Sequence, residues 1–264
     1  KPDHRARSEP ERSARLIRIL IVLLMIPGLA HSACRQALSM GLDVSGSVDD
    51  EEYQLQLQGV IAALNAPDVQ DVLFMQPEAP IRLHVYEWSG PINQTIIVPW
   101  TAIQTPADLA QVSGLLAGHQ RGVRAPTTAI GSAILAGYSY LNPQTDCWKR
   151  TLDLSGDGET NVGPLPETIG DDQRPVGVVV NGLVIGAASV DGETQRFVDI
   201  KQLSAYYTAN VIRGPDAFVE VALGYEDYAA AMERKLLREL ASIAIGQLSV
   251  GRTDIDNVDP VGLD

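Results

Sequence analysis

The chain has 264 residues, of which 45% are hydrophobic and 20% are charged, and its formal net charge at pH 7 is −13. This length suits one α/β domain of good size or two small ones, and the composition excludes a disordered or fibrous protein. The acidic excess argues against nucleic acid as a partner, because phosphate binding needs a basic face.

The first 33 residues have the layout of a secretory signal. Three arginines precede an apolar run from Ile19 to Leu29, and small residues follow that run in “AHSAC”. This order is typical of export, and a run of this length is too short to span a bilayer. We therefore expect residues 1–33 to be a signal peptide cleaved near Ser32 or Ala33; a buried core helix is the alternative. Cleavage leaves 14 basic and 30 acidic groups, a net charge of −16. The mature chain would have no membrane span and would lie in the periplasm or outside a bacterial cell.

The first half of the remaining chain alternates apolar strands with helical patterns. Residues 37–44, “ALSMGLDV”, predict a buried strand. Residues 51–66 predict a helix, because apolar side chains recur at spacings of three and four. Residues 81–88 and 94–100 predict two strands joined by a short turn, which is typical of a hairpin. Pro99 places the second of these strands at a sheet edge, since proline cannot donate a hydrogen bond to a neighbouring strand.

The second half continues the alternation. We expect helices at residues 106–118, 128–141, 197–207 and 225–240, buried strands at 150–156 and 176–188, and a last strand region within 210–222. The polar tail, residues 251–264, predicts disorder. Strands that alternate with helices indicate one doubly wound α/β domain over residues 34–250, with a largely parallel sheet covered on both faces. Ligands of such sheets bind beyond the carboxyl ends of the strands.

The first predicted strand ends in “GLDVSGSVDDEEY”, residues 41–53. Asp43 lies where the strand stops, and Ser45 and Ser47 follow at every second position, so the three side chains share one side of an extended backbone. Short hydroxyls and carboxylates suit a hard cation such as Mg²⁺, and the sequence has no Cys or His cluster that would favour zinc or copper. The alternative is helix capping, because Ser47 and Asp50 have the spacing of a capping box.

Two further stretches favour the cation. “RTLDLSGDGETN” is a buried strand that ends in Asp157 and Gly158, where glycine permits a sharp turn beyond the carboxylate. “PTTAIGSAI” places Thr128 at the start of a helix. Each stretch is weak alone, since Asp-Gly is a common turn and Thr is a common N-cap. The metal hypothesis therefore depends on all three stretches, in this order along the chain.

With “DVSGS”, “TAIG” and “LSGDG” in place, the chain resembles the von Willebrand factor type A domains over roughly residues 36–245. Strings such as “VNGLVIG” and “VIRGPDAFV” are similar to a group of exported bacterial proteins of this fold with no assigned function. The resemblance implies a Rossmann-like fold with a six-stranded, mostly parallel sheet, one antiparallel edge strand and helices on both faces.

The same resemblance implies a metal-ion-dependent adhesion site. Ser45, Ser47 and Thr128 would offer hydroxyls, and Asp43 and Asp157 would bind Mg²⁺, or Mn²⁺ or Ca²⁺, directly or through water. An open coordination position would accept an acidic side chain from a protein partner. The implied function is a non-catalytic binding module, and an ion with a purely structural role is an alternative.

The two cysteines, Cys34 and Cys147, lie nine and ten residues before Asp43 and Asp157. In the family's strand order the two strands are parallel neighbours, so the resemblance implies a disulfide at the end of the sheet opposite the metal site. Lipidation of Cys34 is the other possibility in an exported bacterial chain.

An enzyme of another class is also compatible with part of the pattern. An aspartate that ends the first strand and a later “GDGETN” resemble haloacid-dehalogenase-type phosphatases, but Ser45 stands where that family has a second aspartate and Asn161 where it has a further acid. Lys149 lies at the wrong end of its strand for the family's lysine. We expect a packing role for His84 and a structural role for Glu87, with direct ligand contact as the alternative for Glu87. His119 lies in a polar turn, so the sequence shows no convincing nucleophile–histidine pair, and hydrolytic catalysis has little support.

Overall fold

The computed structural model describes residues 33–186 and 193–250. The expected signal peptide, apart from Ala33, and the expected disordered tail lie outside the described residues. Within the described part of the chain, no helix is long and apolar enough to cross a membrane.

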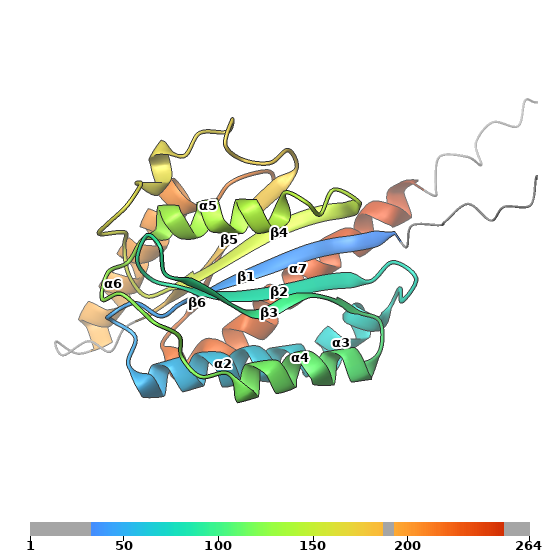
Figure 1. Ribbon diagram of the computed structural model, residues 1–264, viewed down its shortest axis with the longest axis horizontal. Helices are drawn as coiled ribbons and strands as arrows, with labels where there is room; N and C mark the ends of the chain where they lie inside the picture. Colours follow the sequence, from blue (N-terminus) through green and yellow to red (C-terminus); the bar gives the residue numbers. More distant parts are fainter. Residues whose placement is uncertain (1–32, 187–192, 251–264) are drawn as a thin grey trace, which may run out of the picture. The chain divides into compact units, whose positions relative to one another are not determined.

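A six-stranded sheet in the order β3-β2-β1-β4-β5-β6 forms the centre of the domain (Figure 1). All neighbouring strands run parallel except β2 and β3, which form the predicted antiparallel hairpin with β3 at the sheet edge. The predicted fold class is therefore confirmed. The strands are β1 (Cys34–Asp43), β2 (Ile81–Trp88), β3 (Gln94–Ile103), β4 (Cys147–Gly156), β5 (Val178–Ile185) and β6 (Val219–Ala222).

Helices cover both faces of the sheet (Figure 1). One face packs against α2 (Asp50–Leu64), α3 (Pro67–Phe74), α4 (Pro106–Gly118) and α7 (Tyr228–Val250), and the other against α5 (Ile130–Leu141) and α6 (Glu193–Tyr206). Each face has its own buried apolar cluster, and burial of this kind is the main stabilising contribution to folding. Three short helices complete the described elements: η1 (Pro166–Thr168), the π-helix η2 (Tyr207–Val211) and η3 (Tyr225–Asp227).

Local signals explain most of the boundaries and most of the differences from expectation. Asp49, not Ser47, caps α2, because its carboxylate accepts from the backbone N–H groups of Glu51 and Glu52. The expected last strand region, residues 210–222, is a strand only over Val219–Ala222. Its first residues belong to η2, because Tyr207 and Val211 pack into the core as a helical turn. Helix α3 was not predicted, since eight residues carry too few turns for a clear period.

The face of β2 and β3 next to α5 carries an aromatic cluster. His84 on β2 stacks on Trp100 with ring centroids 4.9 Å apart, and Tyr140 of α5 lies 4.7 Å from the same ring. Ser39 Oγ lies 2.9 Å from His84 Nδ1. His84 therefore has the packing role expected from the sequence.

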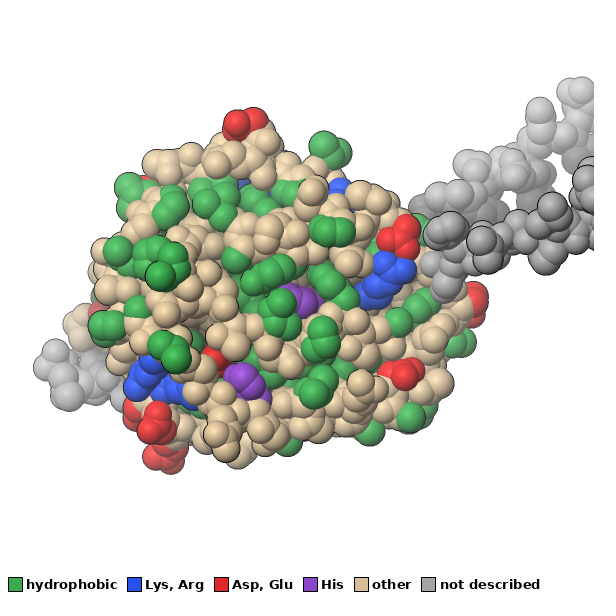
Figure 2. Space-filling view, viewed as in Figure 1, with side chains coloured by type: hydrophobic (Ala, Val, Ile, Leu, Met, Phe, Trp, Pro, Cys, Tyr) green, Lys and Arg blue, Asp and Glu red, His purple; other side chains and the backbone are tan. Residues whose placement is uncertain are grey.

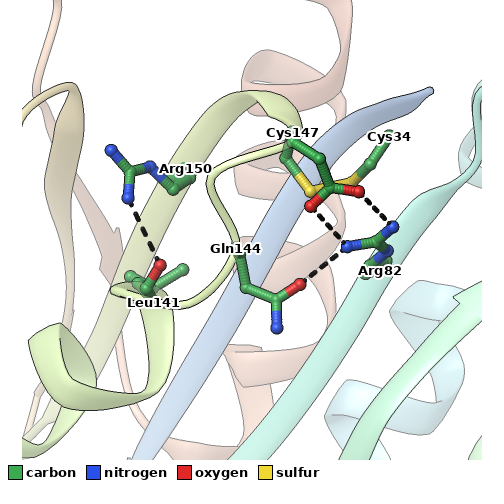
Figure 3. Close-up of a disulfide and its surroundings, with 7 residues drawn as sticks. Cys34, Arg82, Leu141, Gln144, Cys147 and Arg150 are labelled. Atoms are coloured by element: carbon green, nitrogen blue, oxygen red, sulfur yellow. Dashed lines mark hydrogen bonds and ion pairs between the residues drawn. A yellow bond between two sulfur atoms is a disulfide. The ribbon is translucent and has the colours of Figure 1, made fainter. Parts of the chain in front are cut away.

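A disulfide joins the amino ends of β1 and β4. Cys34 and Cys147 are paired in register, with Cα atoms 4.3 Å apart and an S–S distance of 2.04 Å. Beside the bond, Arg82 donates to Asp146 at 2.6 Å and to Gln144 at 2.9 Å (Figure 3). The predicted disulfide is confirmed, and a Cys34 sulfur in this bond is not available for lipidation.

Candidate metal centre

Three loops meet where the parallel strands β1 and β4 end. The first loop follows Asp43 at the end of β1 and leads into α2, the second joins α4 to α5 and contains Thr128, and the third follows β4 and begins with Asp157. Parallel neighbours place their carboxyl ends at one edge of the sheet, so loops far apart in sequence become neighbours there.

A chain of polar contacts links the predicted ligands across the three loops. The Thr128 hydroxyl donates to Ser45 Oγ at 3.3 Å, Ser45 Oγ lies 3.2 Å from Ser47 Oγ, and Ser47 Oγ donates to Asp157 Oδ1 at 2.7 Å. The Ser45 backbone N–H donates to Asp43 Oδ1 at 2.7 Å. The structure therefore brings all five predicted residues into one cluster.

The depth of the cluster varies from one side to the other. Asp43 and Ser45 are fully buried, and Thr128 is 6% exposed. Ser47 and its neighbour Gly46 are exposed, so the cluster opens to solvent through the β1–α2 loop. A centre with a buried base and an open mouth can hold an ion and still present it to another molecule.

Both carboxyl groups of the cluster have raised pKa values. Burial and the nearby charge of Asp157 raise the pKa of Asp43 to about 8, and burial also raises the pKa of Asp157. Asp43 Oδ2 is buried and has no hydrogen-bond partner among the described residues. A buried carboxylate oxygen without a donor is destabilising unless a proton or a cation neutralises it. The donor set therefore fits a divalent cation.

The composition of the cluster indicates which kind of cation. It has two carboxylates and three hydroxyls, and no group of three or more His, Cys, Asp or Glu side chains suited to a metal occurs among the described residues. Oxygen donors of this type suit Mg²⁺, Mn²⁺ or Ca²⁺, whereas zinc and copper sites draw on Cys and His.

The structure excludes helix capping by Ser47 and Thr128. Because Asp49 caps α2, Ser47 is not the helix cap, and its hydroxyl contacts the other site residues instead. Helix α5 begins at Ile130 after Ala129, so Thr128 precedes the helix and makes no cap hydrogen bond. The capping alternative for these two side chains is therefore wrong.

Two arginines of the α4–α5 loop hold the β1–α2 loop in place. Arg121 and Arg124 both donate to the Val48 carbonyl, at 2.7 Å and 2.9 Å, and Arg124 also donates to the Ser45 carbonyl at 3.1 Å. Arg121 further pairs with Asp50 at 3.0 Å. These contacts could not be predicted from the sequence, because a polar loop has no periodicity that indicates which backbone carbonyls its side chains reach.

Glu87 and Asn161 position the other two loops. Glu87 is buried near the end of β2 and accepts from the Gly122 N–H at 2.7 Å and from the Tyr53 hydroxyl at 3.1 Å, which is the expected structural role. Asn161 Oδ1 accepts from the Thr128 N–H at 2.9 Å, and the Asn161 N–H donates back to the Thr128 carbonyl at 2.9 Å. This reciprocal pair fixes Thr128 against the Asp157 loop.

Two further side chains, Tyr225 and Lys149, concern Asp157 and the phosphatase alternative. The Tyr225 hydroxyl donates to Asp157 Oδ2 at 3.3 Å, which no sequence signal indicated. Lys149, the lysine considered for a phosphatase, lies near the amino end of β4 and donates to the Glu239 carbonyl at 3.2 Å. It is at the other end of its strand from Asp157, so the phosphatase pattern is not assembled around Asp43.

Comparison with known sequences gives one family. The profile described as “Protein of unknown function (DUF1194)” matches residues 33–244. No curated protein matches the chain.

Several solved structures share the fold at low sequence identity. Proximal thread matrix protein 1 from the mussel byssus has a TM-score of 0.53 at 16% identity, over 80% of this chain and 49% of that one. Pilus adhesin SpaC from Lactobacillus rhamnosus GG has a TM-score of 0.53 at 15% identity, over 80% and 30%. PilB minor pilin from Streptococcus sanguinis has a TM-score of 0.55 at 12% identity, over 81% and 63%. The chain thus spans half or less of the first two proteins. The likeness shows a von Willebrand factor type A-like fold and confirms the resemblance seen in the sequence.

Proposed function

The chain belongs to the family described as “Protein of unknown function (DUF1194)”, and we propose that it is an exported, non-catalytic binding module. It would hold a divalent cation at Asp43, Ser45, Ser47, Thr128 and Asp157 and capture an acidic side chain of a protein partner through that ion.

The observation that carries this proposal is the hydroxyl–carboxylate cluster itself. Three loops supply one continuous set of oxygen atoms, and its deepest member, Asp43 Oδ2, has no donor among the described residues. Two neighbouring carboxyl groups with raised pKa values are typical of a functional site and give no stability to a turn. The cation would supply positive charge to which a further carboxylate can bind.

The residues of the cluster would bind the ion, and their neighbours would position the loops. Asp43 and Asp157 would balance the charge of a divalent ion, and the three hydroxyls would complete a set of hard oxygen ligands. Arg121, Arg124 and Asn161 would keep the loops in register through the backbone contacts described above. The cation could be Mg²⁺, Mn²⁺ or Ca²⁺.

Two further findings support an exported binding protein. A disulfide is typical of oxidising compartments outside the cytosol. Proteins with a similar fold include an adhesin, a matrix protein and a minor pilin, whose names describe binding or assembly rather than catalysis.

The test is a direct measurement of Mn²⁺ and Mg²⁺ binding by calorimetry, together with thermal unfolding with Mg²⁺ and with EDTA. We expect saturable binding of one ion and a higher unfolding midpoint with Mg²⁺. Asp43→Asn and Asp157→Asn should each abolish the Mg²⁺-dependent shift, because each removes one of the two negative charges.

Glu51→Gln is the matched control. Glu51 is an exposed acid of the first turn of α2 and is not part of the cluster. This variant should bind the ion like the unmodified protein. If Asp43→Asn keeps the same Mg²⁺-dependent shift as Glu51→Gln, the cation does not bind at this cluster and the proposed function is wrong.

A further inference from the structure

Large apolar side chains are exposed on loops beside the candidate metal centre. Ile92 in the β2–β3 turn is 90% exposed, Val123 in the α4–α5 loop is 87% exposed, and Leu165 in the loop after β4 is 48% exposed. Such side chains are unfavourable in water, and a group of them on one surface is typical of an interaction site. Figure 2 shows apolar side chains gathered at the end of the molecule where β1 and β4 have their carboxyl ends.

Contacts between the loops show that these residues form one surface. The Asn93 side chain donates to the Val123 carbonyl at 3.4 Å, so the β2–β3 turn lies against the α4–α5 loop. A Cβ atom on Gly163 would lie 3.6 Å from the Pro91 side chain, so the loop after β4 lies against the same turn. We define the apolar rim as Pro91, Ile92, Val123, Pro126, Pro164 and Leu165, all of them exposed.

The apolar rim reaches the metal centre. A Cβ atom on Gly46 would lie 2.7 Å from the Pro126 carbonyl oxygen, and Gly46 stands between Ser45 and Ser47. A ligand bound at the open side of the cluster therefore has Pro126 as an immediate neighbour, with the rest of the apolar rim beyond it.

The opposite side of the centre is acidic. Tyr225, which donates to Asp157, lines a hollow of about 230 Å³. The charged residues of its lining are four acids and one arginine: Asp49, Glu51, Glu52, Glu226 and Arg196. The β2–β3 turn and the α4–α5 loop contain no Asp or Glu, and the α4–α5 loop contains Arg121 and Arg124. The loop after β4 carries Glu159 next to the centre, but its rim segment, residues 161–165, carries no acid. An acidic ligand is therefore repelled on one side of the centre and not on the other.

We infer that the partner of this domain lies across the apolar rim, and that it is a protein segment in which the metal-bound acidic side chain is flanked by apolar side chains. This inference rests on the proposed function for the acidic contact and adds the direction of approach and the chemistry of the flanks. The apolar side chains of the segment cover Ile92 and Val123, and no part of the segment enters the hollow beside Glu51.

The experiment is selection of a phage-displayed random peptide library on the full domain in Mg²⁺, with elution by EDTA. We expect enriched peptides with one acid and apolar residues within a few positions of it. Ile92→Ser/Val123→Ser should weaken their binding at least tenfold and leave Mn²⁺ affinity within twofold. The matched control is Leu115→Ser on α4, an apolar residue that is 39% exposed and lies outside the apolar rim; it should change neither.

Each other outcome overturns the inference. Enriched peptides without apolar flanks, or equal binding to Ile92→Ser/Val123→Ser, would show that the apolar rim is not the docking surface. Binding that strengthens severalfold after Glu51→Gln, with Mn²⁺ affinity unchanged, would show that the acidic segment lies on the acidic side. No enrichment on a domain that binds Mn²⁺ would remove the docking inference and leave the metal centre intact, whereas failure to bind Mn²⁺ would remove the proposed function itself.

Discussion

Removal of the disulfide should destabilise the domain strongly without affecting the metal centre. The bond closes a loop with a sequence separation of 113 residues. In the chain-entropy treatment, a loop of this length restricts the unfolded chain by about 4–5 kcal/mol at 25 °C. Both cysteines are buried, so alanine is the replacement that avoids placing a hydroxyl in the apolar cluster.

The assay is urea denaturation of Cys34→Ala/Cys147→Ala, of each single variant and of the unmodified protein with and without reductant. We expect each single variant to lose about as much free energy of unfolding as the pair, because either change removes the whole bond. Mn²⁺ affinity should be unchanged, since the ten residues of β1 place the disulfide about 30 Å from Asp43. A loss below about 1 kcal/mol in the double variant, or a large fall in Mn²⁺ affinity, would refute this reasoning.

Three other groups give independent predictions. Burial lowers the pKa of His84 to about 4, so as the pH falls the imidazole is protonated in the unfolded chain before it is protonated in the folded one. The free energy of unfolding should therefore fall by up to about 3 kcal/mol as the pH decreases from about 6.5 to 4. A pH series of unfolding midpoints measures this fall, which His84→Phe should remove. Lys235 is fully buried and pairs with Asp153 and Glu239. Lys235→Met leaves these buried carboxyl groups without a positive partner, so urea denaturation should show a loss of about 3–5 kcal/mol in the free energy of unfolding. A loss below about 1 kcal/mol would contradict this prediction. The buried Tyr207 hydroxyl and Asp43 Oδ2 flank the same small space over Gly156. Tyr207→Phe should therefore weaken Mn²⁺ binding about tenfold. An unchanged Mn²⁺ affinity in calorimetry would show that the Tyr207 hydroxyl does not support the metal centre.

The arrangement of the sheet could be predicted because strand signals and strand ends were both visible in the sequence. The apolar runs around Asp43 and Asp157 identified two strands, and the resemblance supplied their order. The cysteines at matching distances before those aspartates then gave a disulfide that the structure confirms. The edge position of β3 followed from Pro99, because only an edge strand tolerates a residue that cannot donate.

The supports of the metal centre could not be predicted, because they depend on tertiary geometry. Arg121 and Arg124 act through the carbonyls of Ser45 and Val48, which any residue type would offer. Tyr225 reaches Asp157 only because η3 packs beside α2. The capping alternative for Ser47 arose because Ser47–Asp50 and Asp49–Glu52 both have capping-box spacing, and the second pair formed the cap.

The domain is acidic and its proposed ligand is also acidic, so the two repel each other, and the strength of this repulsion depends on the distance between them. A chain without residues 1–33 carries a net charge of −16, which repels an acidic partner, but at physiological ionic strength this repulsion is screened beyond about 8 Å. The acids beside the centre lie along α2, on η3 and at Glu159 in the loop after β4, and the loops of Ile92 and Val123 carry none. Long-range attraction therefore cannot bring the partner to the site. Its affinity must come from short-range contacts, which are the ion itself and apolar surface buried at about 25 cal/mol per Å². This is the physical reason why the metal centre and the apolar rim would have to work together.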